Sequence, residues 1–81
     1  MDFQRPQKHS LTLKGHRTSV SLEDDFWFAF RDISEELNRP INDLAAEIDE
    51  MRGEDCGLAS AIRLFVLNDL QDRLTSDDPV A

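Results

Sequence analysis

The pattern of apolar and polar positions changes its period within residues 17–45. Between residues 17 and 22 apolar and polar side chains alternate, as expected for a strand with one buried face. Two segments with the 3.6-residue period of helices follow directly, separated only by residues 38–40. The pattern therefore predicts a mainly α-helical fold with a short β strand near its start.

The alternation assigns each side chain of the strand to one of two faces. Successive side chains of a strand point to opposite sides, so every second residue shares a face. One face receives Thr18, Val20 and Leu22, and the other receives Arg17, Ser19 and Ser21. The first set predicts an interior face and the second a free face. A Ser21-x-x-Asp24 arrangement gives Ser21 a second interpretation, as the cap of the following helix.

Both helical segments carry an apolar stripe and recognisable ends. The first, residues 23–37, has acids in its first turn, where the helix dipole favours them, and places Phe28 on an exposed side. Asn38 suits the left-handed conformation that ends a helix, and Pro40 suits the first position of the next, residues 41–51. The stripes contain Phe26, Phe30, Ile33 and Leu37 in the first helix, flanked by Trp27, and Ile41, Leu44, Ala45 and Ile48 in the second.

A lone strand would leave hydrogen-bonding groups unpaired on both of its edges. Pairing with the same strand of a second copy satisfies them most simply, which predicts an intertwined homodimer with a shared interior. An alternative arises upstream, because residues 10–14 also alternate and Gly15 offers a turn before the next strand. The shared interior of the predicted dimer contains Val20, Leu22, Phe26, Trp27, Phe30, Ile33, Leu44 and Ile48.

Residues 17–48 resemble the ribbon-helix-helix domain of Arc-type and MetJ-type repressors, with strand, first helix, turn and second helix matching without a gap. The run Arg-Thr-Ser-Val-Ser-Leu-Glu-Asp at residues 17–24, followed by Phe26-Trp27, is also similar to a group of short bacterial ribbon-helix-helix proteins. The resemblance implies a ribbon-helix-helix homodimer that regulates transcription.

The resemblance further implies that the paired strands enter the major groove of double-stranded DNA. The free face would then contact bases through Arg17, Ser19 and Ser21. Arg17 can pair with guanine through two hydrogen bonds, whereas serine reads bases less selectively. If residues 10–14 form a second strand, the dimer would carry a four-stranded sheet, and this segment would have to be short, displaced or bent away.

Contacts to the DNA backbone are expected beside the ribbon. Lys14 and His16 precede the strand and would lie near phosphates. In the family the second helix rests its amino end on a phosphate, which corresponds here to the backbone N–H groups of Ile41 and Asn42.

Residues 58–74 predict a third helix that the minimal ribbon-helix-helix unit lacks. Its apolar residues surround most of its circumference, so it must be covered on most sides. It would pack over the dimer core and form either a contact between two dimers or a docking surface for another protein. In a different register, residues 58–63 would be the second helix of the domain and residues 40–52 an insertion. The remaining segments are expected to be a flexible arm, residues 1–9, and a flexible tail, residues 75–81, around a domain of residues 10–74.

Composition narrows the functional classes. With 81 residues there is room for one domain, and the single cysteine, Cys56, excludes an internal disulfide and makes a structural metal site improbable. The first 22 residues carry four cations and one acid, whereas the rest carry five cations and sixteen acids, so the basic end is the strand end. No catalytic motif, cofactor motif, secretory signal or membrane-spanning run is present, and a cytoplasmic protein without enzymatic activity is expected.

Two functions from different classes remain. The first is a homodimeric, sequence-specific DNA-binding repressor or other regulator that recognises a palindromic site. The second is a dimeric interaction module, such as an antitoxin or adaptor, that holds a protein partner through the third helix or the exposed Phe28. The overall net charge of −8 favours the second function.

Overall fold

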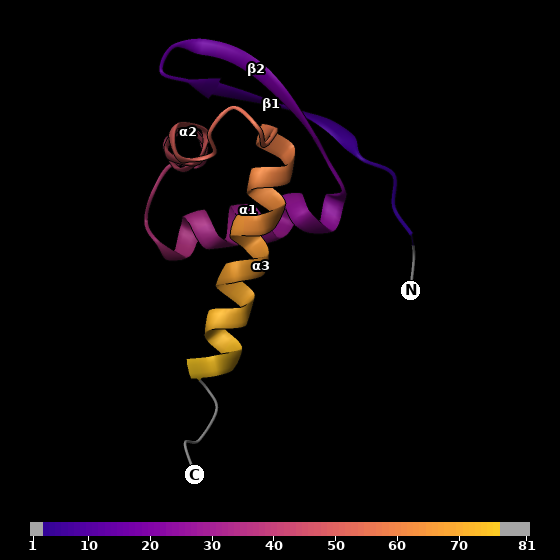
Figure 1. Cartoon of the computed structure of the whole chain (residues 1–81), viewed down its shortest axis with the longest axis vertical. Helices are drawn as coiled ribbons and strands as arrows, with labels where there is room; N and C mark the ends of the chain where they lie inside the picture. Colours follow the sequence, from indigo (N-terminus) through magenta and orange to yellow (C-terminus); the bar gives the residue numbers. More distant parts are fainter. Residues whose placement is uncertain (1–2, 77–81) are drawn as a thin grey trace.

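The computed structural model describes residues 3–76, and the expected tail beyond Ser76 lies outside this range. A two-stranded sheet is followed by three helices (Figure 1). The elements are β1 (Gln7–Leu13), β2 (His16–Leu22), α1 (Asp24–Glu36), α2 (Ile41–Met51) and α3 (Leu58–Ser76). The predicted mainly α-helical fold with a short ribbon and an additional C-terminal helix is confirmed.

β1 and β2 form an antiparallel hairpin within the chain. The register runs from Gln7 opposite Leu22 to Leu13 opposite His16, so the strands are paired along their whole length. The connecting residues Lys14 and Gly15 both have positive φ, 51° and 83°. Two left-handed residues make the tight turn whose twist matches that of paired strands. The turn predicted at Gly15 is therefore confirmed.

The prediction of a second copy assumed that β2 has no partner strand in its own chain, and the hairpin shows that this assumption is wrong. β2 already has a partner in its own chain, and β1 is neither short nor displaced. Part of the reason is hydrophobic, because Leu11 of β1 is buried with only 2% of its surface exposed. The outer edge of β2 has no strand beside it in the described chain.

The first strand starts earlier than expected. Residues 7–9 belong to β1, whereas the sequence pattern predicts a flexible arm there. The ring of His9 lies against Trp27, and Gln4 exchanges two hydrogen bonds with Asp25 at the start of α1. At the other end, α3 continues to Ser76 and includes two residues assigned to the tail.

The helix ends follow the sequence signals with small differences. Asn38 has a φ of 54°, as predicted for a residue that ends a helix. Pro40 precedes α2 instead of occupying its first position. Glu23 is the residue before α1 and no side chain caps that helix, so the interpretation of Ser21 as a cap is wrong.

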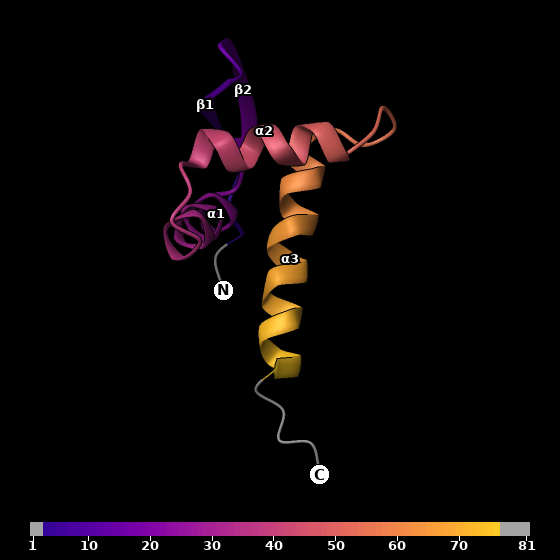
Figure 2. The ribbon, with the colours of Figure 1, turned by 90° about the vertical axis from the view of Figure 1, so that its left-hand side faces the viewer.

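One hydrophobic interior joins all five elements. Figure 2 shows the hairpin above α1 and α2, with α3 crossing beneath α2 and extending away from the rest. The buried residues are Leu11, Val20, Leu22, Phe30, Ile33, Leu44, Ala45, Ile48, Ile62 and Val66, with Phe26 and Trp27 half-buried against them. The residues expected in a dimer core thus form the interior of a single chain, and a role in a shared interior stays a prediction.

α3 is only partly covered. Its buried residues, Ile62 and Val66, lie in the first half of the helix. The uncovered apolar side chains of α3 are Leu64, Leu67, Leu70 and Leu74, each 46–73% exposed. None of the three helices in the described range combines the length and apolar character needed to cross a bilayer.

Candidate nucleic-acid interface

The strand register defines an outer face of the hairpin, directed away from the core. Residues directly opposite each other in an antiparallel pair project to the same side. Val20, which is buried, therefore marks the inner side together with its partner His9. The pairs on the other side are Lys8 with Ser21, Ser10 with Ser19, and Thr12 with Arg17. These six exposed residues are called the outer face below.

The outer face contains cations and hydroxyl groups but no acid. Lys8 and Arg17 are its two charged residues, and neither has an ion-pair partner among residues 3–76. The other four residues are serines and threonines, which both donate and accept hydrogen bonds. The chain as a whole has a net charge of −8, but the outer face itself holds no carboxylate that would repel a polyanion.

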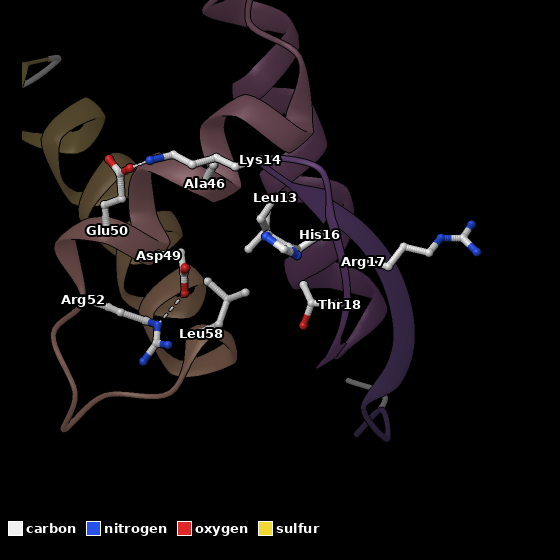
Figure 3. A pocket seen from close by; sticks show the side chains of 10 residues that line it. All are labelled: Leu13, Lys14, His16, Arg17, Thr18, Ala46, Asp49, Glu50, Arg52 and Leu58. Carbon is white, nitrogen blue, oxygen red and sulfur yellow. Dashed lines mark hydrogen bonds and ion pairs between the residues drawn. The ribbon is translucent and has the colours of Figure 1, made fainter.

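The structure brings the three predicted base-contacting residues together. Arg17, Ser19 and Ser21 lie on one side of β2, and all are exposed. Figure 3 shows Arg17 pointing out from the ribbon, away from the side chains of Leu13 and Leu58 on the helix side. In Figure 1 the hairpin and the free end of α3 lie at opposite ends of the molecule. A long ligand on the outer face would therefore be remote from the acids of α3.

Lys14 and His16 lie at the turn end of the hairpin and do not belong to the outer face. Lys14 is in the turn and forms an ion pair with Glu50 of α2. His16 is exposed on the inner side of the sheet, opposite Leu13, and lines a hollow of about 520 Å³ between hairpin and helices, which Lys14 and Arg17 also border (Figure 3). Asp49 and Glu50 line the same hollow, so its charge is mixed and it is not an evident anion site.

The amino end of α2 lies against the edge of β1. The side-chain oxygen of Asn42 accepts a hydrogen bond from the backbone N–H of Thr12, at 3.0 Å. Ile41 is half-buried beside it. This contact places the first turn of α2, where a phosphate contact is expected, next to the outer face. Two features oppose such a contact, because Pro40 supplies no capping side chain and Asp43 adds a negative charge to the first turn.

Arg63 of α3 forms hydrogen bonds with the end of the ribbon that lies away from the turn. Its guanidinium donates to Glu23 at 2.9 Å and to the carbonyl oxygen of Ser21 at 3.3 Å. A backbone hydrogen bond at Glu23, followed by the hydrogen bond from Arg63, lowers the pKa of the Glu23 carboxyl. Glu23 is therefore ionised at neutral pH, and its charge is matched by Arg63.

Arg73 makes a second link between α3 and α1. It pairs with Glu36 of α1 and donates to Asp69 of its own helix at 2.7 Å. The hydrogen bond from Arg73 lowers the pKa of Glu36, and the hydrogen bonds with Glu36 and Asp69 raise the pKa of Arg73. The two links fix α3 at both ends of its contact with α1.

Three residues of the outer face were not identified from the sequence. All three come from β1: Ser10 and Thr12 lie in the alternating segment recognised at residues 10–14, whereas Lys8 lies in the predicted flexible arm. The two-residue period was therefore a signal for Ser10 and Thr12 but not for Lys8. Only the pairing of β1 with β2 assigns these side chains to the same side as Arg17.

A two-stranded ribbon that precedes helices and exposes a polar, acid-free face is typical of proteins that use a ribbon to contact nucleic acid. The family model of the ribbon-helix-helix domain matches residues 6–70, from just before β1 into the second half of α3. The chain belongs to the ribbon-helix-helix domain family. Domains of this family are typically dimeric DNA-binding or regulatory modules without enzymatic activity. No curated protein and no solved structure matches the chain significantly.

The matched range is wider than the resemblance seen in the sequence. The resemblance to Arc-type and MetJ-type domains covers residues 17–48, whereas the family match also includes β1 and most of α3. Both elements therefore lie within, or largely within, the matched range.

Proposed function

We propose that this protein is a sequence-specific DNA-binding transcriptional regulator, a repressor that acts as a homodimer with its β ribbon in the major groove. The observation that carries the proposal is the outer face, which is exposed, holds Arg17 and Lys8, and lacks acids. Membership of a family that is typically DNA-binding supports it.

Arg17 is the residue expected to contribute most to base selection. A guanidinium can donate two parallel hydrogen bonds to guanine, which is worth roughly 1–3 kcal/mol of discrimination. Ser19 and Ser21 follow on the same face at every second position and accept or donate single hydrogen bonds. The expected specificity is therefore concentrated near the turn end of the ribbon.

Phosphates beside the groove are expected to contact the edges of the ribbon. Lys14 and His16 at the turn end supply cationic and polar side chains, and Lys14 must exchange its exposed pairing with Glu50 for a phosphate. An exposed ion pair contributes little to stability, so this exchange costs little. Ile41 and Asn42 supply the backbone N–H groups at the start of α2.

A homodimer would place two ribbons on a palindromic site. Dimers bind two half-sites related by the symmetry of the protein, so the operator mirrors that symmetry. Sedimentation equilibrium of the full chain between micromolar and millimolar concentration tests this part directly. A single species with the mass of one chain, both free and on operator DNA, would reject the dimer.

DNA binding is tested by selecting duplexes from a random library at low salt and measuring their affinity by fluorescence anisotropy. Arg17→Ala should weaken binding about 5- to 150-fold for each half-site contacted, as 1–3 kcal/mol per arginine implies. Arg31→Ala is the matched control, because it removes the same charge from an exposed position on α1. Binding absent at low salt, or equally affected by both substitutions, would reject the proposal.

A second candidate function is favoured by the uncovered leucines of α3. Scattered exposed apolar residues are ordinary, but four leucines exposed on one helix are the kind of apolar surface that a protein partner would cover. An antitoxin or adaptor would use this surface to hold a protein. Co-purification of a stoichiometric protein partner, with no duplex enriched in the selection, would favour this function over the first.

A further inference from the structure

The second half of α3 carries an apolar face that nothing in the described chain covers. Its exposed side chains are Leu64, Leu67, Leu70 and Leu74, which together amount to more than two fully exposed leucines. Figure 2 shows this half of the helix extending away from the hairpin and the other helices. We propose that this face binds the same face of α3 in a second copy of the chain, with the two helices antiparallel. The contact is separate from ribbon pairing and goes beyond the proposed function.

The spacing of the face is that of two helices packed side by side. Leu64, Leu67, Gln71 and Leu74 follow one another at intervals of three, four and three residues, the a/d pattern of paired helices. These four residues are called the seam below. When two seams run antiparallel about a common centre, Leu64 lies opposite the partner's Leu74, and Leu67 lies opposite the partner's Gln71. The seam is therefore complementary to itself.

The charges of α3 support a second copy as the occupant. Between residues 64 and 75 the charged residues are Asp69, Asp72 and Arg73. At about 100° per residue, all three lie roughly 120° or more from the centre of the seam. Two copies of a chain with a net charge of −8 repel each other, so they approach most easily through an uncharged face. A strongly charged partner would find no complementary charge on the seam.

A hollow beside the start of the seam can receive the end of the partner's helix. It has a volume of about 370 Å³ and is lined in part by Met51 of α2 and by Leu64 and Phe65 of α3. The antiparallel arrangement places the partner's Leu74 opposite Leu64, and hence at this hollow. Met51 is 67% exposed and Leu74 is 73% exposed. The contact would therefore cover the two most exposed large apolar side chains of the three helices.

Gln71 is the polar residue of the seam and favours one register. A polar side chain at a core position of paired helices lowers their stability but specifies how they align. In the proposed alignment the Gln71 residues of the two copies lie about 6 Å apart along the helix axis. Their amides, which both donate and accept, can then bind each other. An alignment shifted by one turn would separate the two amides.

The antiparallel contact keeps the two ribbons apart. The hairpin and the free end of α3 lie at opposite ends of the molecule (Figure 1). A two-fold axis across the second half of α3 therefore places the two hairpins at opposite ends of the pair, so these two chains cannot also share a ribbon. The contact joins chains of different ribbon-paired dimers. Its seam is only about 15 Å long, and small interfaces are typical of weak association.

Sedimentation equilibrium of the full chain at rising concentration tests the contact. At high concentration the mean mass of the parent should be about twice that of Leu67→Glu, because the substitution places an unpaired carboxylate in the seam. The factor of two holds whether or not the ribbon also pairs. Phe28→Glu is the matched control, because it makes the same change at an exposed apolar position of α1 and should keep the mass of the parent.

Circular dichroism of both variants checks that their helices are retained. Equal masses of the parent and a folded Leu67→Glu would overturn the inference and leave the proposed function intact. Gln71→Leu provides a second variant, which should tighten self-association about 3- to 10-fold because it removes the polar residue from the seam. Self-association that Gln71→Leu leaves unchanged would also overturn the inference.

Disulfide trapping tests the direction of the helices. In a Cys56→Ser background, chains with Leu67→Cys are mixed with chains that carry Gln71→Cys and are then oxidised. The antiparallel contact predicts cross-links mainly between the two different variants, because their cysteines lie opposite each other within the reach of a disulfide. Cross-links mainly between identical variants would show parallel helices and overturn the proposed arrangement.

Discussion

His9 and Trp27 stack face to face, with ring centroids 4.1 Å apart and planes inclined by 9°. His9 lies on the inner side of β1 and Trp27 near the start of α1, so the stack joins the first strand to the first helix. Trp27 also meets Phe30 of the core at 6.4 Å. The stack thus connects β1 to the hydrophobic interior and explains why this strand lies in the sheet from Gln7 onward.

Substitution of His9 by alanine should loosen β1 and destabilise the protein by about 0.5–1.5 kcal/mol, the usual contribution of an aromatic pair beyond its buried area. Trp27 is the only tryptophan, so its emission reports on this contact directly. The emission maximum should move to longer wavelength as the ring becomes more solvated. His16→Ala, at an exposed position of β2, is the control and should leave both the spectrum and the urea midpoint unchanged.

The hairpin turn should tolerate asparagine better than its present lysine. Lys14 has a φ of 51°, and asparagine adopts this conformation more readily than lysine. Lys14→Asn should increase the free energy of unfolding by at most about 1–2 kcal/mol, the cost of the left-handed conformation for an ordinary residue, despite loss of the exposed ion pair with Glu50.

Gly15→Ala should have the opposite effect on the same turn. Gly15 has a φ of 83°, and a Cβ there costs about 1–2 kcal/mol even though the surrounding space is open. Urea denaturation of the two variants checks both signs. Destabilisation by Lys14→Asn would contradict the assigned turn geometry.

The contact between Arg63 and Glu23 should make stability depend on pH in the acidic range. The pKa of Glu23 in the folded protein is below its ordinary value of 4.5. The contact therefore stabilises the fold above pH 4.5, and this contribution is lost as the pH falls through the lowered pKa. A carboxyl-detected NMR titration gives the pKa directly.

Arg63→Gln should raise the pKa of Glu23 only part of the way back, because the backbone hydrogen bond persists. Arg73→Gln is the reciprocal control and should raise the pKa of Glu36 while leaving Glu23 as it was. Equal titration of Glu23 in the parent and in Arg63→Gln would show that the link from α3 to the ribbon is absent in solution.

The two phenylalanines of α1 provide a matched test of the core. Phe30 is fully buried and meets Phe65 of α3 edge to face, with centroids 6.1 Å apart, whereas Phe28 is 53% exposed. Phe30→Ala should destabilise the chain by about 3–5 kcal/mol, because it removes buried surface and leaves a cavity. Phe28→Ala should change stability by less than about 0.5 kcal/mol. Similar losses in both variants, measured by urea unfolding, would place Phe28 in an interface.

Much of the fold was determined by the sequence alone. The two-residue period identified the buried side of β2 at Val20 and Leu22, although Thr18 on that side is exposed. The 3.6-residue period identified the inner faces of α1 and α2 except at Leu37, which follows α1 and is 51% exposed. Asn38 ended the first helix, and Gly15 formed the predicted turn. These signals are local, because burial on one face and a positive φ each impose a preference on a single position of the chain. The six buried residues of the predicted dimer core follow from the same periods.

Only the tertiary structure decided which strand pairs with β2. The hydrogen bonds of a strand edge come from the backbone, and they are satisfied equally well by β1 or by another chain. The choice depends on where Leu11 and His9 can be buried, and this requires α1 to be in place. The register of the two strands then places Lys8, Ser10 and Thr12 on the same face as Arg17. The sequence of either strand alone does not determine this, because it depends on which residues lie opposite each other.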